Sequence, residues 1–393
     1  MDIKLADRVK RIKPSPTLAV TARANELRAQ GKDIIGLGAG EPDFDTPDHI
    51  KQAAIDALGR GFTKYTAVDG TAELKAAIVN KFKNENSLDY EANQVLVSCG
   101  GKQSFFNLAQ ALLNSGDEVI IPAPYWVSYP DMVLLADGKP VIIETSYDQQ
   151  FKISPEQLDK AITAKTRLLV INSPSNPTGQ CYTKDELAAL GEVLRQHPHV
   201  LIASDDMYEH ILWSGEPFIN IVNVCPDLYE RSIVMNGVSK AYSMTGWRIG
   251  YAAGPAPLIQ SMKKIQSQST SNPTSIAQVA AQAALEGDQT CIATMLETFK
   301  TRHDMVVEGL NKIEGVRCLP SQGTFYAFPD VQEMINNIDG VETDVDLAEH
   351  LIEQAGIALV PGSAFGAPGH MRLSYATSTE NLQQALERLM KIV

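Results

Sequence analysis

Seven short apolar runs in the middle of the chain constrain its fold more than any other feature. The segments between them carry amphipathic helical patterns, and the runs are Val95–Ser98, Glu118–Ile121, Pro140–Ile143, Leu168–Ile171, Val200–Ala203, Ser232–Met235 and Ile249–Ala253. Apolar strands that alternate with amphipathic helices are typical of a parallel or mixed sheet covered on both faces. Such α/β sheets bind ligands at the carboxyl ends of their strands, and polar motifs follow several of these runs.

The pattern changes after about residue 290, where a second and smaller α/β unit is predicted. Its elements are a helix over 290–312, strands over 324–328, 357–360 and 371–374, and helices near 345–354 and 379–390. A chain of 393 residues is long enough for two or three domains. We therefore predict a large domain over 50–290 and a small domain over 1–49 and 291–393.

Composition restricts the partners of this chain. Lys and Arg total 34 against 47 Asp and Glu, a net charge of −13. This balance argues against a nucleic-acid or anionic-membrane partner, so an anion site must be built from a few placed cations. The five scattered cysteines form no CxxC pair, which predicts neither disulfides nor a metal site. No apolar leader or run of about 18 apolar residues is present, and we expect a cytoplasmic protein.

A glycine cluster at Gly36, Gly38 and Gly40 could suggest a dinucleotide-binding turn. It lacks the third glycine of that fingerprint and the helix that should follow it. Pro42 and Pro47 prevent a helix from starting there. The dinucleotide interpretation is therefore excluded by context.

Lys240 and Arg248 stand eight positions apart in the stretch Asn236–Gly254, NGVSKAYSMTGWRIGYAAG. Most lysines are solvated surface charges, but small, apolar and aromatic residues crowd both of these cations. A free lysine amine, with a pKa near ~10.4, is mostly protonated at neutral pH. Burial beside another cation lowers that pKa and produces a nucleophile that can form a Schiff base.

Further polar motifs follow other predicted strands. They are Cys99–Ser104 (CGGKQS), Pro124–Tyr129 (PYWVSY), Asn172–Gly179 (NSPSNPTG), Ser204–His210 (SDDMYEH) and His370–Tyr375 (HMRLSY). The first joins two glycines to a predicted helix start, an arrangement that allows backbone N–H groups to approach an anion. Each motif taken alone also has a structural interpretation, as a helix cap, a turn or a packed aromatic residue.

Together and in this order, the motifs resemble those of the class I aminotransferases that use pyridoxal 5′-phosphate (PLP). The similarity spans essentially the whole chain and is closest to bacterial aspartate aminotransferases whose relatives also accept prephenate. The resemblance implies a fold-type I transferase, with a mixed, mostly parallel sheet and a smaller α/β domain. It also implies small-molecule amino acids and 2-oxo acids as substrates, and a homodimer with a shared active site.

The resemblance assigns roles around the cofactor ring. Lys240 would attach the cofactor covalently and act as general acid and base. Asp205 would face the pyridine nitrogen, and Tyr208 and Asn176 would bond the 3′-oxygen. Trp126 would stack on the ring.

The resemblance also assigns a phosphate site. Gly101, Lys102 and Gln103 would surround the phosphate, Arg248 would add charge-assisted hydrogen bonds, and Tyr65 would reach it from the neighbouring subunit. Relatives often carry a serine three positions before the lysine, where this chain has Gly237. Whether Ser239 replaces it stays open.

The expected substrate site shares Trp126 and Asn176 with the cofactor site. By resemblance, Gly40 would lie against the substrate α-carboxylate and Arg372 would bind it through two hydrogen bonds. Lys102 and Lys13 are both candidates for the distal carboxylate of a dicarboxylic substrate.

We expect ping-pong transamination of L-aspartate with 2-oxoglutarate, which gives oxaloacetate and L-glutamate. An aromatic or prephenate aminotransferase is one alternative, and a PLP lyase on the same fold is another. A regulator of the same fold without catalysis would need a DNA-binding module, and residues 1–35 are too short and not basic enough for one.

Overall fold

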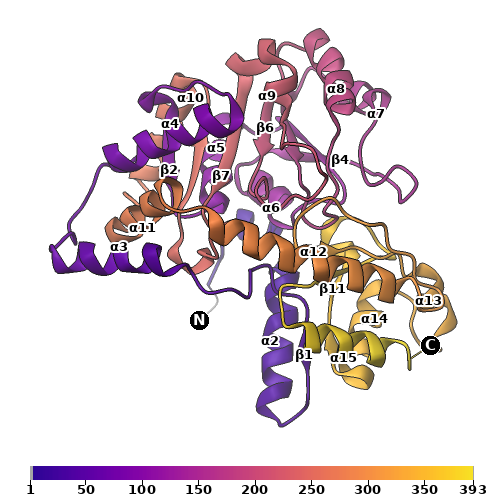
Figure 1. Cartoon of the computed structure of the whole chain (residues 1–393). Helices are drawn as coiled ribbons and strands as arrows, with labels where there is room; N and C mark the ends of the chain where they lie inside the picture. Colours follow the sequence, from indigo (N-terminus) through magenta and orange to yellow (C-terminus); the bar gives the residue numbers. More distant parts are fainter. Residues whose placement is uncertain (1–2, 393) are drawn as a thin grey trace.

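A computed structural model describes residues 3–392 of the chain. Each of the seven predicted runs forms a strand of one seven-stranded sheet, in the order β2-β8-β7-β6-β5-β3-β4 (Figure 1). The strands are β2 (Val95–Ser98), β3 (Glu118–Pro122), β4 (Lys139–Ile143), β5 (Thr166–Asn172), β6 (Leu201–Asp205), β7 (Ser232–Gly237) and β8 (Gly250–Ala253). Strand β8 runs antiparallel to both of its neighbours, and the other pairs are parallel. The predicted mixed, mostly parallel sheet is confirmed.

Helices cover both faces of this sheet, because successive strand residues point to opposite sides. Val95 and Val97 belong to one buried cluster with residues of α4 (Ala72–Asn86), α8 (Lys184–Gln196) and α11 (Ser275–Glu286). Leu96, between them, belongs to a second cluster with α5 (Gly101–Leu112), α6 (Ser128–Leu135) and α10 (Ala256–Ser267). Shorter or peripheral helices are α3 (Asp48–Gly59), α7 (Pro155–Ala161) and α9 (Ile221–Val224).

The remaining elements build a smaller unit beside the large sheet, with a main buried cluster of its own and a small separate cluster under α2. Its strands are β1 (Ile35–Gly36), β9 (Tyr326–Ala327), β10 (Ile357–Ala358), β11 (Val360–Pro361) and β12 (Met371–Ser374). Its helices are α2 (Pro16–Ala29), α12 (Thr290–Leu310), α13 (Gln332–Asn337), α14 (Asp344–His350) and α15 (Thr379–Leu389), with α1 (Asp7–Arg11) before them. The N-terminal segment joins this unit through the parallel pair β1–β10.

Three of the predicted elements of this unit differ in detail. The strand expected over 324–328 is limited to the two residues of β9. The strand expected over 357–360 is two strands, because residues 357–358 pair with β1 and residues 360–361 pair with β12. The helix expected over 345–354 changes after His350 into a π-helical turn, Leu351–Ala355. The domain boundaries predicted after residues 49 and 290 stay predictions, and the outer limits at 1 and 393 lie outside the described residues.

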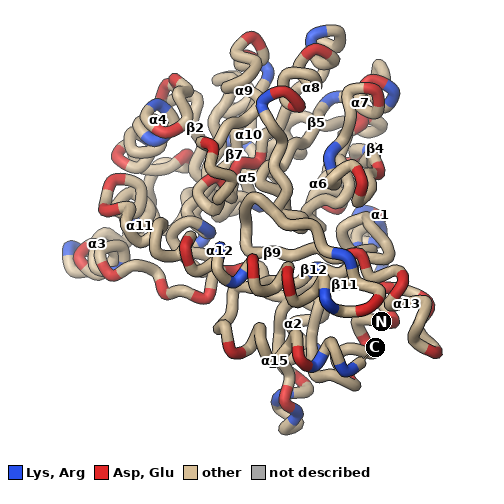
Figure 2. Tube along the Cα trace, turned by 45° about the vertical axis from the view of Figure 1, so that its right-hand side comes forward, with Lys and Arg blue, Asp and Glu red and all other residues tan. Residues whose placement is uncertain are grey.

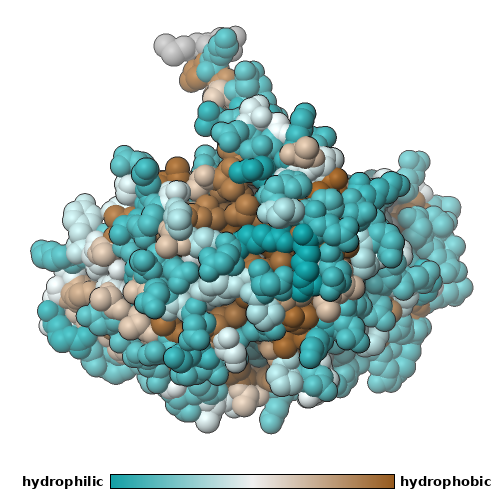
Figure 3. Space-filling model, turned by 90° about the horizontal axis from the view of Figure 1, so that it is seen from above, coloured by the Kyte–Doolittle hydropathy of each residue, from teal (hydrophilic) through white to brown (hydrophobic). Residues whose placement is uncertain are grey.

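The surface carries charges of both signs on its outer helices (Figure 2). Seen from above, the N-terminal segment that begins at Ile3 projects from the body of the molecule (Figure 3). Within residues 3–392, no helix combines the length and the apolar character that crossing a membrane requires.

Candidate active site

A cavity of about 470 Å³ lies beside the carboxyl ends of β5, β6 and β7 and collects most of the predicted site residues. These are Gly40, Gly101, Lys102, Trp126, Asn176, Asp205, Tyr208, Lys240, Arg248 and Arg372. The parallel strands end at the same edge of the sheet, and their following loops therefore meet there. The smaller unit closes the cavity with the loop after β1 and with β12.

Lys240 follows β7, and its amine donates a hydrogen bond to the backbone carbonyl of Gly40. Burial, together with the charge of Arg372, lowers the pKa of Lys240 to about 8, and the charge of Glu41 opposes part of the shift. Removal from water disfavours the charged form of an amine, and a neighbouring cation acts in the same direction. A considerable fraction of the amine is therefore neutral near physiological pH.

Asp205 and Asp206 are adjacent in sequence but have different surroundings. Asp205 lines the cavity, and its carboxylate accepts hydrogen bonds from the Tyr129 hydroxyl and, at 3.3 Å, from the Met207 N–H. Burial raises the pKa of Asp205, and these bonds and the Lys240 charge oppose that shift. Asp206 points into the protein.

The interior partners of Asp206 are the Ser204 hydroxyl at 2.6 Å and the Asn220 amide at 2.7 Å. Burial raises the pKa of Asp206 to about 7. Of the two carboxylates, only Asp205 is available to a ligand in the cavity.

Arg372 is fully buried in β12 and is held from two sides. Its guanidinium donates to the Asn176 side-chain oxygen at 2.9 Å and to the Gly38 carbonyl at 2.8 Å. Its Nε has no partner among the described residues. A buried donor without a partner costs free energy, about 1–3 kcal/mol, so Arg372 is prepared for a further acceptor.

The loop between β2 and α5 brings backbone N–H groups close to Arg248. Gly100 has φ +87°, and a Cβ there would clash with the Arg248 guanidinium. Gly250, at the start of β8, packs so closely that its Cβ would clash with the Gly101 nitrogen. The free N–H groups at the start of α5 and the Arg248 guanidinium therefore face the same part of the cavity. This arrangement is suited to a phosphate.

Lys102 and Trp126 form another wall of the cavity. The Lys102 amine lies 5.2 Å from the centre of the Trp126 ring. Burial lowers the pKa of Lys102, and the charge of Arg248 adds to the effect. No ion pair or hydrogen bond to the Lys102 amine is present within residues 3–392, and this cation remains available to an anion in the cavity.

Three of the predicted site residues lie outside the cavity. The Gln103 side chain instead bonds the Cys99 N–H and the Thr270 hydroxyl, both at 2.6 Å. Tyr65 is 91% exposed on a loop, and Lys13 lines a neighbouring cavity of about 680 Å³. The ligand contacts expected of these three residues stay predictions.

The surroundings of position 237 explain why this chain has a glycine where relatives often have a serine. A Cβ at position 237 would lie 3.0 Å from the Ile249 carbonyl and 3.1 Å from the Met207 side chain. A serine would therefore be crowded, whereas Ser239 lines the cavity. The replacement of one serine by the other stays a prediction.

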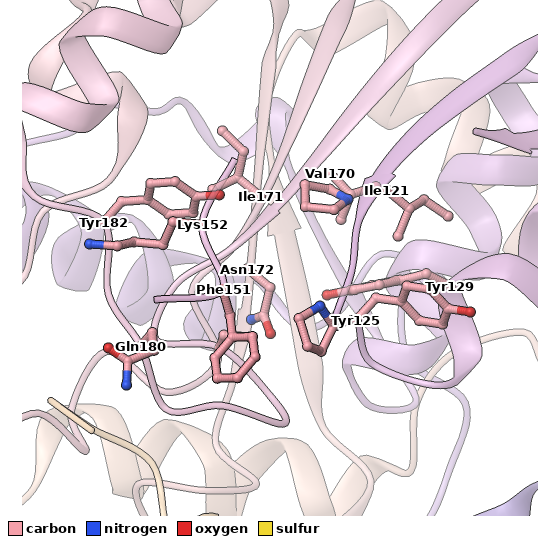
Figure 4. A pocket seen from close by; sticks show the side chains of 13 residues that line it. Ile121, Tyr125, Tyr129, Phe151, Lys152, Val170, Ile171, Asn172, Gln180 and Tyr182 are labelled. Carbon is pink, nitrogen blue, oxygen red and sulfur yellow. The ribbon is translucent and has the colours of Figure 1, made fainter. Parts of the chain in front are cut away.

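Two further groups of residues lie outside the main cavity. Glu85, Glu209 and His210 could hold a metal ion, but the Glu209 carboxylate already accepts bonds from the Lys81 amine and from Asn86 and Asn236, both at 2.7 Å. A small cavity of about 30 Å³ is bordered by residues that include Tyr129, Lys152 and Asn172 (Figure 4). In this view the Tyr129 hydroxyl points away from the other labelled side chains.

Sequence reasoning missed several residues that line the main cavity. They are Ser15, Thr17, Leu18 and Thr21 before and within α2, together with Glu41, Met207, Thr245 and Tyr326. The helical pattern of α2 does not indicate which of its residues reach the cavity. For Glu41 and Thr245 the signal was present, because both stand within a few residues of predicted site residues.

Comparisons with known proteins show the family and the fold. The profile of the family "Aminotransferase class I and II" matches residues 32–389. An aspartate/prephenate aminotransferase of Nitrosomonas europaea is 61% identical, with both chains covered completely. The crystal structure of an aspartate aminotransferase from Rhizobium meliloti, 48% identical, has a TM-score of 0.96 and covers 100% of this chain and 99% of its own. An aspartate aminotransferase from Thermus thermophilus with maleate, 45% identical, has a TM-score of 0.94 with both chains fully covered.

The lowered pKa of Lys240 can be measured directly. In protein freed of small molecules, acetylation of Lys240 should reach half its maximal rate near pH 8, because the neutral amine is the reactive form above that pH. Lys51, whose pKa is raised by its hydrogen bond to Asp48, should react only at much higher pH. Arg372→Met should move the Lys240 midpoint upward, and the exposed Arg317→Met should not. Mass spectrometry of the peptides gives each rate, and a Lys240 midpoint near that of Lys51 would contradict the account.

Proposed function

This chain belongs to the class I and II aminotransferases, and we propose that it catalyses PLP-dependent transamination of L-aspartate with 2-oxoglutarate, giving oxaloacetate and L-glutamate. One observation carries the proposal. A single cavity holds a lysine amine with a lowered pKa, a buried carboxylate and a buried arginine with a free donor: Lys240, Asp205 and Arg372. The names of the Nitrosomonas, Rhizobium and Thermus relatives support aspartate as a substrate.

The residues present fit PLP. Gly101, the free N–H groups of α5 and Arg248 suit its phosphate, and the Asp205 carboxylate suits a protonated pyridine nitrogen. Trp126 offers an aromatic face, and Tyr208 and Asn176 offer polar groups to the ring oxygen. When bound, PLP supplies an electron sink for the carbon that loses its proton.

The residues of the chain supply binding and proton transfer. Arg372 and the side-chain amide of Asn176 would hold the α-carboxylate of either substrate, in the space that Gly40 leaves open beside the Tyr326 hydroxyl. Lys240 would remove and return the proton at the substrate α-carbon, since its amine is partly neutral near pH 7. The amino donor and the 2-oxo acceptor would use this arrangement in turn.

Lys102 is the strongest candidate for the second carboxylate of aspartate. A cation in the first turn of α5 opposes the helix dipole, which costs a few tenths of a kcal/mol, and an anionic ligand would offset that cost. Ser15 and Thr17 line the same cavity and could add hydrogen bonds. The Thermus aspartate aminotransferase is solved with maleate, which is also a dicarboxylate.

Prephenate is a second candidate substrate, because the name of the Nitrosomonas relative includes it. The cavity of about 470 Å³ has room for a ring. Lys13 stands only two residues from Ser15, which lines this cavity. A movement of the N-terminal segment would be needed to bring Lys13 to a substrate.

We further propose a homodimer in which Tyr65 completes the phosphate site of the partner subunit. Tyr65 is 91% exposed, and the apolar residues Ile55, Leu58 and Phe62 near it are also exposed. The projecting N-terminal segment exposes Ile3, Leu5 and Val9 (Figure 3). Exposed apolar groups of this size are typical of interfaces.

The five free cysteines support a reducing, cytoplasmic location.

Replacement of Lys240 tests the proposed function. The unmodified protein should convert aspartate and 2-oxoglutarate in a coupled assay for oxaloacetate. Lys240→Ala should lose more than the ~10²–10⁴-fold that is typical of a missing general acid–base, because it also loses the attachment point. Near-normal turnover in this variant would exclude the proposal.

The neighbouring carboxylates provide a matched pair of variants. Asp205→Ala should reduce kcat by several orders of magnitude, because an unprotonated ring is a poor electron sink. Asp206→Ala should act mainly on stability, because its partners Ser204 and Asn220 lie in the interior. Steady-state kinetics together with thermal unfolding separate these effects. Equal losses of kcat in the two variants would show that the assignment is wrong.

Lys102→Ala tests whether Lys102 binds the second carboxylate of aspartate. We expect kcat/KM for aspartate to fall by ~10–200-fold, the effect of one lost charge-assisted contact. The value for phenylalanine, which lacks a side-chain carboxylate, should fall much less. Parallel losses on both amino acids would instead assign Lys102 to the phosphate.

A further inference from the structure

Tyr326 stands where the two parts of the site meet, although no sequence pattern indicated it. It is fully buried in β9 and borders the main cavity. Tyr326 pairs with Ser374 across β9 and β12, and Arg372 lies two residues before Ser374 on the same face of its strand. Tyr326 and Arg372 therefore present neighbouring side chains from the small sheet to the cavity.

The ring and the hydroxyl of Tyr326 make different contacts. The centre of the ring is 4.4 Å from the Arg372 guanidinium carbon, and the Phe365 ring is 4.9 Å from the same atom. These distances are typical of cation–π contacts. The hydroxyl lies 2.9 Å from the Tyr208 hydroxyl, which belongs to the loop after β6 of the large sheet.

The bond between the two hydroxyls has a defined direction when a ligand is present. Either hydroxyl can donate in the protein alone. A Tyr208 that donates its proton to a ligand oxygen can only accept from Tyr326. Tyr326 would then hold the Tyr208 phenol in the orientation that aims its proton into the cavity.

We infer that Tyr326 is a positioning residue that orients the Tyr208 phenol through its hydroxyl and supports the Arg372 guanidinium through its ring. The inference rests on the proposed function, in which Tyr208 faces the cofactor and Arg372 holds the substrate carboxylate. Tyr326 thereby connects the part of the cavity proposed for the cofactor with the part proposed for the substrate carboxylate. It belongs to the small sheet, whereas Tyr208 belongs to a loop of the large sheet.

Two substitutions separate the two contacts, and a third controls for packing. Tyr326→Phe removes the hydroxyl and keeps the ring under Arg372, whereas Tyr326→Leu removes both. Tyr375→Phe is the matched control, because Tyr375 is also a fully buried tyrosine that packs in the same cluster as Tyr326, and its hydroxyl donates to the Thr324 carbonyl at 3.3 Å. Thermal unfolding establishes that each variant is folded.

The measurements are the Kd of PLP for the cofactor-free protein, the absorbance of the PLP-loaded protein against pH, and the Kd of succinate for the loaded protein. Tyr326→Phe should raise the Kd of PLP by about 2- to 12-fold, the effect of one lost hydrogen bond. It should also shift the midpoint of the absorbance change with pH, and it should leave the Kd of succinate unchanged. Tyr326→Leu should in addition weaken succinate by about 2- to 30-fold, the range of a cation–π contact. Tyr375→Phe should change neither constant.

Specific outcomes overturn the inference. A Tyr326→Phe protein that matches the unmodified protein in both PLP affinity and pH midpoint excludes the role of the hydroxyl. A loss of PLP affinity in Tyr375→Phe equal to that in Tyr326→Phe would show that the effect comes from packing. An unchanged Kd of succinate in Tyr326→Leu would exclude the support of Arg372 by the ring. If the unmodified protein binds no PLP, the proposed function fails and the inference fails with it. If the unmodified protein binds PLP and the Tyr326 variants bind PLP and succinate as it does, the inference fails and the proposed function stands.

Discussion

The burial of the Lys240 amine beside the Arg372 guanidinium is the constraint on which the rest of the site depends. Two like charges in a cavity disfavour each other, and loss of water disfavours both. The Gly40 carbonyl, the Asp205 carboxylate and Glu41 offset part of this cost. The result is an amine that gives up its proton readily, in a cavity that Lys102, Arg248 and Arg372 also line although the whole chain has a net charge of −13.

The two units of the fold divide the site between them. The large sheet supplies Asp205 and Lys240 from the ends of parallel strands. The small unit supplies Arg372 from β12, and Asn176 of the large unit bonds it across the cavity at 2.9 Å. The interior carboxylates Asp206 and Glu209 use their hydrogen bonds within the protein, and this separates these two structural acids from Asp205, which lines the cavity.

Local patterns predicted the large sheet well, because each strand is a short apolar run and polar motifs follow several of them. They could not divide residues 357–361 between two strands, since that division depends on pairing with β1 and β12. Most of the residues that the resemblance proposes for the site line one cavity, and Asp205 rather than Asp206 is among them, while their roles stay predictions. Tyr326 could not be found in this way, because it reaches the cavity through tertiary packing and no predicted site residue stands near it in the sequence. For Ser15 and Thr17 a signal was present, because the predicted residue Lys13 stands two and four residues before them.

The identity of the attachment lysine tests the account most directly. The purified protein would be incubated with PLP, reduced with borohydride, digested and analysed by mass spectrometry, so that the lysine that carries the cofactor is located. The account predicts a stoichiometric label on Lys240, and loss of that label in the presence of a competing amino acid added before reduction. A label on a different lysine, or one spread over the exposed lysines with Lys240 unmodified, would contradict it.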